Sequence, residues 1–330
     1  MVRPKFMDSP YFVGEMNNWH LKDGAPKEVR KEFDQFMKVL YPLKIEEAKK
    51  SLRNSKLKLV IDLNRGIFRE ELHPRDQRGR FTTKEAAKNT DVKWKDESGN
   101  YKPERLKLHD AIVNQILKEA GASQEKPIAV LMGGGSATGK STLRNLTVID
   151  TLKEAGQSAG VVDCDDIKQA IPEYKTLARN IAAKTVHDES SDIASYALDE
   201  LMKNKKNLVF DGTMKNYKKY AKMIDKLKKS GYEVRILIAD CPLEVAIERS
   251  EARAKATGRK VPVEIIEESH RSVPGAFVNL KHLVDRFDVF DTSGTVPELI
   301  HSNKHMEVSK YSNFLSKGNA VDPEIKKGGE

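Results

Sequence analysis

The sequence lacks the features that mark membrane and secreted proteins. No run within its 330 residues approaches the roughly 20 consecutive apolar residues that a helix needs to span a bilayer. The opening MVRPKFMDSP has no apolar stretch after its basic residues, which argues against a secretory signal. Only two cysteines are present, Cys164 and Cys241, which are too few for a disulfide framework. We therefore expect a protein that works in a reducing compartment.

A strong basic bias is missing from most of the chain, although the total charge is +9. Such a total invites a nucleic-acid-binding interpretation. However, residues 1–104 carry a net charge of +6, residues 105–300 carry +2, and residues 301–330 carry +1. The surplus therefore belongs mainly to the first third of the chain, and it does not explain what the middle of the chain does.

The first third predicts helices followed by a linker. Apolar residues at spacings of three and four between Val29 and Leu40 predict an amphipathic helix within a mostly helical region 1–72. Residues 73–104 are polar and rich in charge, which predicts a basic polar linker. Within it, HPRDQRGRF resembles a short element of phage head and minor capsid proteins, and that resemblance implies a mobile-element origin.

From Leu106 onward, short apolar runs alternate with longer amphipathic stretches. Continuous apolar strands separated by helices indicate a parallel sheet that is covered on both faces. We predict an α/β domain over residues 105–300, with a five-stranded parallel sheet flanked by helices, and a polar tail over residues 301–330. The five runs are IAVLMGG (128–134), AGVVDCD (159–165), NLVFDGT (207–213), EVRILIAD (233–240) and FDVFDTS (287–293).

Residues 134–141 (GGSATGKS) match the phosphate-loop pattern G-x-x-x-x-G-K-[ST] at every fixed position. Glycines let backbone N–H groups surround a phosphate, and the helix that follows adds the positive end of its dipole. Lys140 would reach the β- and γ-phosphates, and the Ser141 hydroxyl would bind Mg²⁺. We therefore predict a site for nucleotide phosphates and Mg²⁺ formed by Gly134, Gly135, Ser136, Ala137, Thr138, Gly139, Lys140, Ser141 and Thr142.

Acidic residues follow two of the predicted strands, where open α/β sheets bind ligands. Asp163, Asp165 and Asp166 end the second strand, and a carboxylate there would take a proton from an attacking hydroxyl, bind metal or cap the next helix. Asp211 ends the third strand, with Thr213 two residues later, which fits either an acceptor site or a plain turn. The N-K-x-D pattern of small GTPases is missing and the domain is too small for an oligomeric ATPase module, so a small kinase fits better.

Arginines follow the fourth strand on a predicted helix. Arg249 and Arg253 are four residues apart and share a helix face, and Arg259 lies just beyond them. Arginines in this position would clamp the transferred phosphoryl group. Acidic residues are interspersed, so a salt-bridged surface helix is the alternative.

Five motifs occur in order between residues 128 and 293: GGGSATGKSTLR, VVDCDDIKQAIPEY, TVHDESSDIA, NLVFDGTMKN and RSEARAKATGRKVP. In this order they resemble the zeta toxin family, P-loop kinases of bacterial toxin–antitoxin systems and phages. The resemblance implies an enzyme that uses ATP and Mg²⁺ to phosphorylate the 3′-hydroxyl of UDP-N-acetylglucosamine. The product would poison the synthesis of cell-wall precursors.

The resemblance also implies roles for individual residues. Asp165 would be the catalytic base beside Lys140, and Arg253 and Arg259 would clamp the phosphates. Two acceptor-side positions depart from the family, with Asp211 where Glu is frequent and Lys215 where Arg occurs, so the acceptor stays open. The residues implied at the acceptor are Asp211, Thr213, Lys215, Glu189 and Ser190.

Three functions remain open from the sequence. The first is the UDP-N-acetylglucosamine kinase, and the second is a kinase of a nucleoside, a dinucleotide or a polynucleotide end. The third is a phage structural or packaged protein with a regulatory kinase domain. Residues 1–104 would bind an antitoxin or a phage structural partner, and nucleic acid is a less favoured partner. The expected location is the bacterial cytoplasm, with association with a virion as the alternative.

Overall fold

The computed structural model describes residues 9–15, 18–21, 24–31, 89–177, 179–257 and 261–325. The predicted amphipathic helix between Val29 and Leu40 lies mostly outside these residues. Within the predicted helical region, the described part contains an antiparallel pair of strands, β1 (Phe12–Glu15) and β2 (Asn18–Leu21). The mostly helical prediction therefore missed this hairpin.

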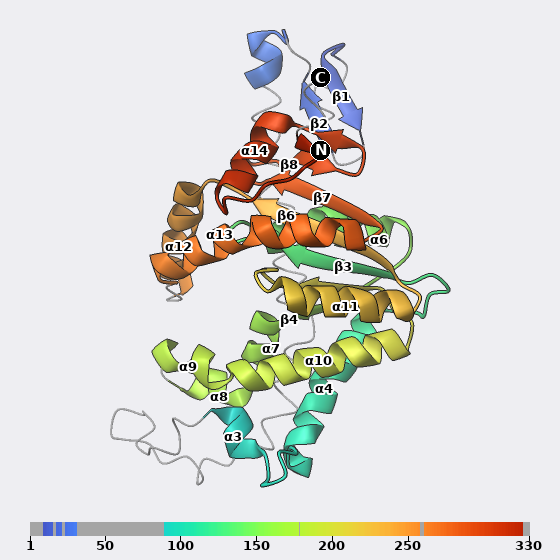
Figure 1. The fold of residues 1–330 in the computed structure, drawn as a ribbon, viewed down its shortest axis with the longest axis vertical. Coiled ribbons are helices and arrows are strands. Elements are labelled where there is room, and N and C mark those ends of the chain that lie inside the picture. Colours follow the sequence, from blue (N-terminus) through green and yellow to red (C-terminus); the bar gives the residue numbers. More distant parts are fainter. Residues whose placement is uncertain are drawn as a thin grey trace.

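The main sheet has seven strands in the order β4-β5-β3-β6-β7-β8-β9 (Figure 1). The first five are parallel and correspond to the five predicted runs, so the parallel core of the prediction is confirmed. Two antiparallel strands extend it at the β7 edge. The bounds are β3 (Ile128–Gly133), β4 (Gly160–Asp163), β5 (Leu208–Asp211), β6 (Glu233–Asp240), β7 (Arg286–Asp291), β8 (Glu298–Ser302) and β9 (His305–Met306).

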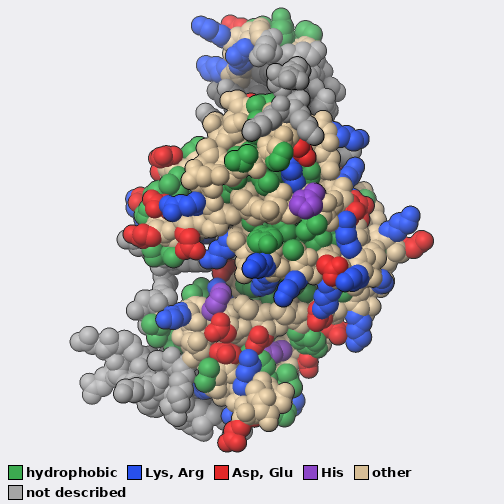
Figure 2. Space-filling model, viewed as in Figure 1, with side chains coloured by type: hydrophobic (Ala, Val, Ile, Leu, Met, Phe, Trp, Pro, Cys, Tyr) green, Lys and Arg blue, Asp and Glu red, His purple; other side chains and the backbone are tan. Residues whose placement is uncertain are grey.

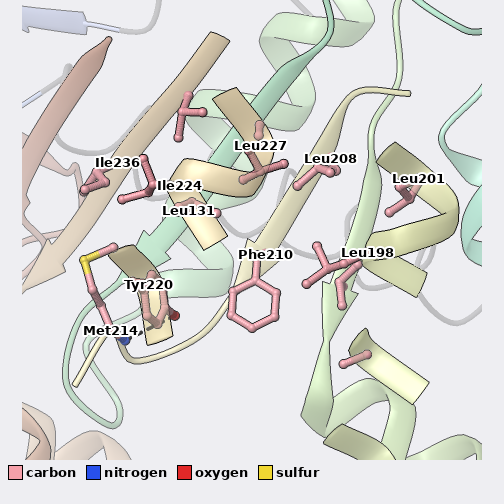
Figure 3. Close-up of a cluster of buried hydrophobic side chains, with 14 of the residues drawn as sticks. Leu131, Leu198, Leu201, Leu208, Phe210, Met214, Tyr220, Ile224, Leu227 and Ile236 are labelled. Carbon is pink, nitrogen blue, oxygen red and sulfur yellow. Dashed lines mark hydrogen bonds between the residues drawn. The ribbon is translucent and has the colours of Figure 1, made fainter. Parts of the chain in front are cut away.

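Helices cover both faces of the sheet, as expected for strands that are apolar throughout. Alternate residues of β3 point to opposite faces: Leu131 lies in the larger core cluster, and Val130 lies in the smaller one. Figure 3 shows the larger cluster, where side chains of α10 and α11 meet Leu131, Phe210 and Ile236 of the sheet. The long helices that contribute to this cluster are α4 (Pro103–Glu119), α10 (His187–Lys203), α11 (Tyr217–Lys229) and α13 (Val263–Leu280).

The opposite face is covered by the helical stretch that leaves β3. It runs as α5 (Lys140–Arg144), a π-helical turn η4 (Asn145–Ile149) and α6 (Asp150–Glu154). Leu143 and Val148 pack in the smaller cluster. The remaining elements are α3 (Thr90–Trp94), α7 (Cys164–Ala170), α8 (Pro172–Thr176), α9 (Arg179–Thr185), α12 (Leu243–Thr257), the 3-10 turn η5 (Lys281–Leu283) and α14 (Val308–Ser316).

The last part of the predicted linker is folded. Residues 89–104 contain α3 and the start of α4, and they contact the segment from α8 to α10. The Trp94 indole N–H donates to Glu173 Oε1 at 2.8 Å, and the Thr90 hydroxyl donates to the Thr185 carbonyl at 3.3 Å. These partners lie far along the chain, so the local composition could not reveal them. The rest of the predicted linker lies outside the described residues.

The predicted polar tail is also part of the fold up to residue 325. Tyr311, Phe314 and Leu315 of α14 are buried in the larger core cluster. The Tyr311 hydroxyl donates to Asp322 Oδ2 at 2.5 Å, and Lys281 Nζ lies 2.6 Å from the same carboxylate oxygen. The apolar residues of this segment are sparse, but they share one helix face. Among the helices of the described part, none is long and apolar enough to cross a bilayer.

Candidate active site

The predicted phosphate loop connects β3 to α5 and is shaped by close packing. Gly134 has φ 139° and Gly139, at the start of α5, has φ 84°, both in the region that favours glycine. A Cβ on Gly134 would collide with the Ala239 carbonyl oxygen, and one on Gly135 would collide with the His270 ring. The loop therefore requires glycine at these positions for reasons that are visible in the packing.

The side chain of Lys140 turns back onto this loop. Its Nζ donates to the carbonyls of Gly135 at 2.7 Å and Gly134 at 3.0 Å. Burial lowers the pKa of Lys140, and the negative charges of Asp211, Asp163 and Asp165 act in the opposite direction. Lys140 and the aspartates that follow β4 and β5 are therefore close enough to interact electrostatically. This agrees with the expectation that these strands end beside the phosphate loop.

A buried arginine joins the two acidic strand ends. Asp163 and Asp211 are register partners at the carboxyl ends of β4 and β5. Arg144 Nη1 lies 2.7 Å from Asp211 Oδ2 and 3.6 Å from Asp163 Oδ2, and Arg144 is only 5% exposed. Burial raises the pKa of Asp163 to about 7, and the charges of Asp211 and Asp166 add to this rise. Burial also raises the pKa of Asp166.

Asp163 and Asp165 have different positions in the turn that starts α7. Asp163 Oδ1 accepts the Asp165 N–H at 2.8 Å, so Asp163 is the N-cap of the helix. The Asp165 side chain is 42% exposed, and its Oδ1 accepts a hydrogen bond from Lys168 Nζ at 3.2 Å. Of the two, Asp165 is the carboxylate that an acceptor hydroxyl can reach from solvent.

The arginines of α12 approach the phosphate loop. Arg253 is close enough for its positive charge to lower the pKa of Lys140 further. Arg249 Nη2 donates to the Thr292 carbonyl at 2.7 Å, and its Nη1 would lie 3.7 Å from a Cβ on Gly139. Arg249 therefore binds the backbone after β7 and not only the surface of its own helix. Arg259 lies outside the described residues.

The residues implied at the acceptor are not brought together in one open pocket. Asp211 is turned inward to Arg144, with its side chain 5% exposed. The Thr213 carbonyl accepts the Gly134 N–H at 3.3 Å, so this residue does border the loop. Lys215 is exposed and lies 3.5 Å from Glu268 of α13.

The side chains of Glu189 and Ser190 form hydrogen bonds inside the protein. Glu189 is fully buried and accepts hydrogen bonds from Arg105 at 2.5 and 2.8 Å, and its Oε1 lies 2.8 Å from His109 Nε2. Burial alone would raise the pKa of Glu189, but these hydrogen bonds outweigh it and lower the value to about 2. The Ser190 hydroxyl donates to the His187 carbonyl at 2.7 Å. This differs from their predicted place beside the acceptor, because their partners come from α4 and from within α10.

A surface hollow lies on the side to which the sheet's carboxyl ends point. The arrowheads of β3 and β6 point to that side in Figure 1. Figure 2 shows the hollow between the part formed by α12 and α13 and the part formed by α7 to α10, with charged side chains along its edges. Ser141 and Thr142 are exposed at the start of α5. Ser141 directly follows Lys140, which interacts with the charges of Asp163, Asp165 and Asp211, so hydroxyl and carboxylate oxygens, the hard donors that Mg²⁺ prefers, are present at this end of the sheet.

The family model described as Zeta toxin matches residues 113–305, which is more than half of the chain. The chain belongs to the zeta toxin family. The match starts within α4 and ends at β9, so it contains the whole main sheet apart from the last residue of β9. The family resemblance of the five motifs is thereby confirmed.

Curated proteins of different kinds are similar to parts of this chain. The toxin PezT of Streptococcus pneumoniae is 30% identical over 125 residues, covering 36% of this chain and 47% of PezT. The calmodulin calcium-dependent NAD kinase of Arabidopsis thaliana is 23% identical over 237 residues, covering 56% of this chain and 44% of that protein. This chain therefore spans less than half the length of either curated relative. A solved chain of the AvrRxo1-ORF1:-ORF2 complex has the same fold, with a TM-score of 0.57 and 19% identity over 73% of this chain and 94% of its own.

Arg144 is a residue of this site that was not predicted from the sequence. It lies four residues after Lys140, which places both side chains on one face of α5. That spacing was the available signal, but it says nothing about burial. Only the sheet register, which pairs Asp163 with Asp211, creates the charge that Arg144 offsets.

Proposed function

We propose that this zeta toxin family member is an ATP- and Mg²⁺-dependent kinase that phosphorylates a hydroxyl of a small nucleotide-containing molecule. The observation that carries the proposal is the position of Lys140. Its ammonium group, in a phosphate loop, lies within the field of the Asp165 carboxylate and of the Arg253 guanidinium. A phosphate anchor, a reachable base and a second cation therefore share one site, which is the set that phosphoryl transfer requires.

The residues act as follows in this proposal. The loop and Lys140 hold the β- and γ-phosphates, and the Ser141 hydroxyl holds Mg²⁺, which offsets phosphate charge when it is bound. Asp165 takes the proton of the acceptor hydroxyl as that oxygen bonds to the γ-phosphorus. The bond between the γ-phosphorus and the bridging oxygen breaks, and ADP leaves. Arg253, together with Arg259, stabilises the charge on the transferred group.

UDP-N-acetylglucosamine, phosphorylated at its 3′-hydroxyl, is the leading acceptor. Family membership and the PezT relative support it, and such a product would act as a toxin on cell-wall precursor synthesis. A dinucleotide such as NAD is the second candidate, because a relative named as an NAD kinase matches a longer stretch of this chain than PezT does. The inward turn of Asp211 and the presence of Lys215 both make the acceptor side different from the family pattern.

The acceptor is tested by incubating the protein with ATP, Mg²⁺ and each candidate separately, followed by mass spectrometry. UDP-N-acetylglucosamine should gain one phosphoryl group, with NAD, a nucleoside and an oligonucleotide as the comparison set. Lys140→Ala and Asp165→Asn should abolish the product, whereas Lys310→Met, on α14, should not. Product from NAD alone would move the assignment to the dinucleotide, and full activity of Lys140→Ala would overturn the mechanism.

We further propose that a partner protein restrains the activity, acting through residues 1–104. The solved relative is half of a two-protein complex, which supports this proposal.

The toxin role is tested by expression in a bacterium, which should arrest growth for the wild type and not for Lys140→Ala. Growth arrest that is equal in both would contradict the toxin role.

A further inference from the structure

Two neighbouring residues of α13 hold the backbone of the phosphate loop. The Ser136 N–H donates to the Ser269 hydroxyl oxygen at 2.8 Å. The Ser136 carbonyl lies 3.1 Å from Nε2 of His270. Both hydrogen-bonding groups of one loop residue are therefore taken by side chains that lie more than 130 residues later in the chain.

The contact is tight as well as polar. The imidazole of His270 fills the space where a Cβ of Gly135 would be, so the ring lies directly on the loop backbone. Ser269 and His270 are each 5% exposed. The Ser269 hydroxyl donates to the Ile266 carbonyl at 2.7 Å, which leaves its oxygen lone pair directed to the Ser136 N–H.

The position of the proton on the His270 ring follows from these contacts. A ring nitrogen that faces a carbonyl must carry the proton, so Nε2 is the donor to Ser136. Nδ1 is buried and has no hydrogen-bond partner among the described residues. Burial lowers the pKa of His270, and the cations facing it, Lys140 from α5 and Lys317 from the end of α14, lower it further. The hydrogen bond to Ser136 opposes this change, and the net shift favours the neutral ring, whose single proton Nε2 donates to the loop.

The helix is itself supported at this point. Pro274 lies four residues after His270, and because proline has no N–H the normal helical bond to the His270 carbonyl is missing. Gly318, just after α14, packs against the carbonyl of Arg271 so closely that a Cβ there would collide with it. Lys317, beside it, donates to Asp240 at 2.5 Å at the end of β6. The end of α14 therefore supports the turn of α13 that carries Ser269 and His270.

We propose that Ser269 and His270 are positioning residues for nucleotide binding: they fix Gly135 and Ser136 so that the rest of the loop is already arranged to receive the triphosphate. The inference rests on the proposed function and adds residues to its ATP site. The N–H groups of Gly134 and Ser136 donate to the Thr213 carbonyl and the Ser269 hydroxyl, so in the first part of the loop these two donors are already bonded within the protein. The start of α5, where Ser141 is exposed, is left for phosphate.

The test is the equilibrium affinity for ATP with Mg²⁺, measured by calorimetry on the full chain. Ser269→Ala and His270→Ala should each weaken binding roughly 3- to 10-fold, the range that follows from losing one neutral hydrogen bond. His270→Gln should recover most of the affinity, because its amide nitrogen can donate to the same carbonyl. Thermal unfolding of each variant shows whether it is folded at the temperature of measurement.

Matched controls are available in the same region. Ser272→Ala removes a hydroxyl of α13 whose bond goes to the Glu268 carbonyl within the helix. His282→Ala removes an exposed histidine of η5. Both should leave the ATP affinity unchanged. In turnover assays, the KM for ATP should rise in Ser269→Ala and His270→Ala, while the KM for the acceptor stays constant.

The failure of this inference can be told apart from the failure of the proposed function. If Ser269→Ala and His270→Ala lower the unfolding temperature but bind ATP as the wild type does, the two residues are structural and the inference is wrong. If the KM values for ATP and acceptor rise together, it is equally wrong. If the wild type binds ATP with the predicted variant pattern but phosphorylates no acceptor, the inference stands and the proposed kinase fails.

Discussion

Arg144 is the residue on which the charge balance of the site depends. It is buried between two carboxylates, and taking a single partner out of such a group leaves an uncompensated charge. We expect Arg144→Met to lower the free energy of unfolding by roughly 3–5 kcal/mol, measured by urea denaturation. The double variant Arg144→Met with Asp211→Asn should recover part of this loss. Equal stabilities of the single and double variants would contradict the proposed pairing.

Asp163 should make the stability of the folded protein depend on pH in a predictable direction. Its folded-state pKa is about 7, above the ordinary value of 3.8, because burial and nearby acids disfavour its charge. Between these two values the folded protein binds more protons than the unfolded chain, so the contribution of Asp163 to stability is present below pH 4 and is lost as the pH rises towards 7.

Asp163→Asn tests this contribution while keeping the helix cap, since asparagine is also a good N-cap residue. Unfolding free energies of the wild type and the variant are compared from pH 4.5 to pH 8. The stability of the variant relative to the wild type should increase as the pH rises through this window and level off above pH 7. A difference that is constant with pH would contradict the raised pKa.

At the scale of elements, Glu189 connects α10 to α4. Arg105 contacts both Glu173 and Glu189, and all three are buried. We expect Glu189→Gln to cost ~1.5–3 kcal/mol of stability through its weakened charged hydrogen bonds. The KM for the acceptor, measured well below the unfolding temperature, should not change. Asp188→Asn, at an exposed neighbouring position, is the control, and a raised acceptor KM specific to Glu189→Gln would restore the role that the family resemblance implied.

The elements that the sequence predicted are those whose cause is local. Each core strand is a continuous apolar run, so its type could be read directly, and the phosphate loop is a contiguous motif. By contrast, α3 depends on Trp94 reaching Glu173, and α14 depends on Tyr311 reaching the core and Asp322. Glu189 was predicted as a site residue because its motif resembles one that borders the acceptor in the zeta toxin family. Its true partners, Arg105 and His109, become neighbours only when α4 docks.

The same limit applies to the site. The proximity of Lys140 to the acidic end of a strand could be predicted, because a motif and a strand end are each visible in one segment of sequence. Arg144, Ser269 and His270 could not, because their relevance comes from the register of β4 with β5 and from the crossing of α13 over the loop. Spacing identifies which residues share a face of a helix, but it does not say what that face meets.

At the scale of the whole molecule, the phosphate loop is held by segments from across the chain. The Thr292 hydroxyl, after β7, donates to the Thr138 carbonyl at 2.6 Å, and α13 holds Ser136. Lys317 reaches back from the last helix to Asp240 and to the Cys241 carbonyl. The conformation of the phosphate loop is therefore linked to the folding of segments from across the domain, including the segment after the family match.

Lys317→Met tests this link, with Lys310→Met as a matched lysine of α14 whose partners are at the surface. Burial raises the pKa of Asp240, and Lys317 opposes that rise. Without Lys317, Asp240 is neutralised by a proton at low pH but becomes an unpaired buried charge at high pH. The loss of unfolding free energy in Lys317→Met should therefore be larger at pH 8 than at pH 5, reaching ~1.5–3 kcal/mol. The affinity of Lys317→Met for ATP should fall in parallel. The unfolding free energy of Lys310→Met should stay within about 1 kcal/mol of the wild type at both pH values. A loss that is independent of pH would mean that Lys317 contributes packing and not charge.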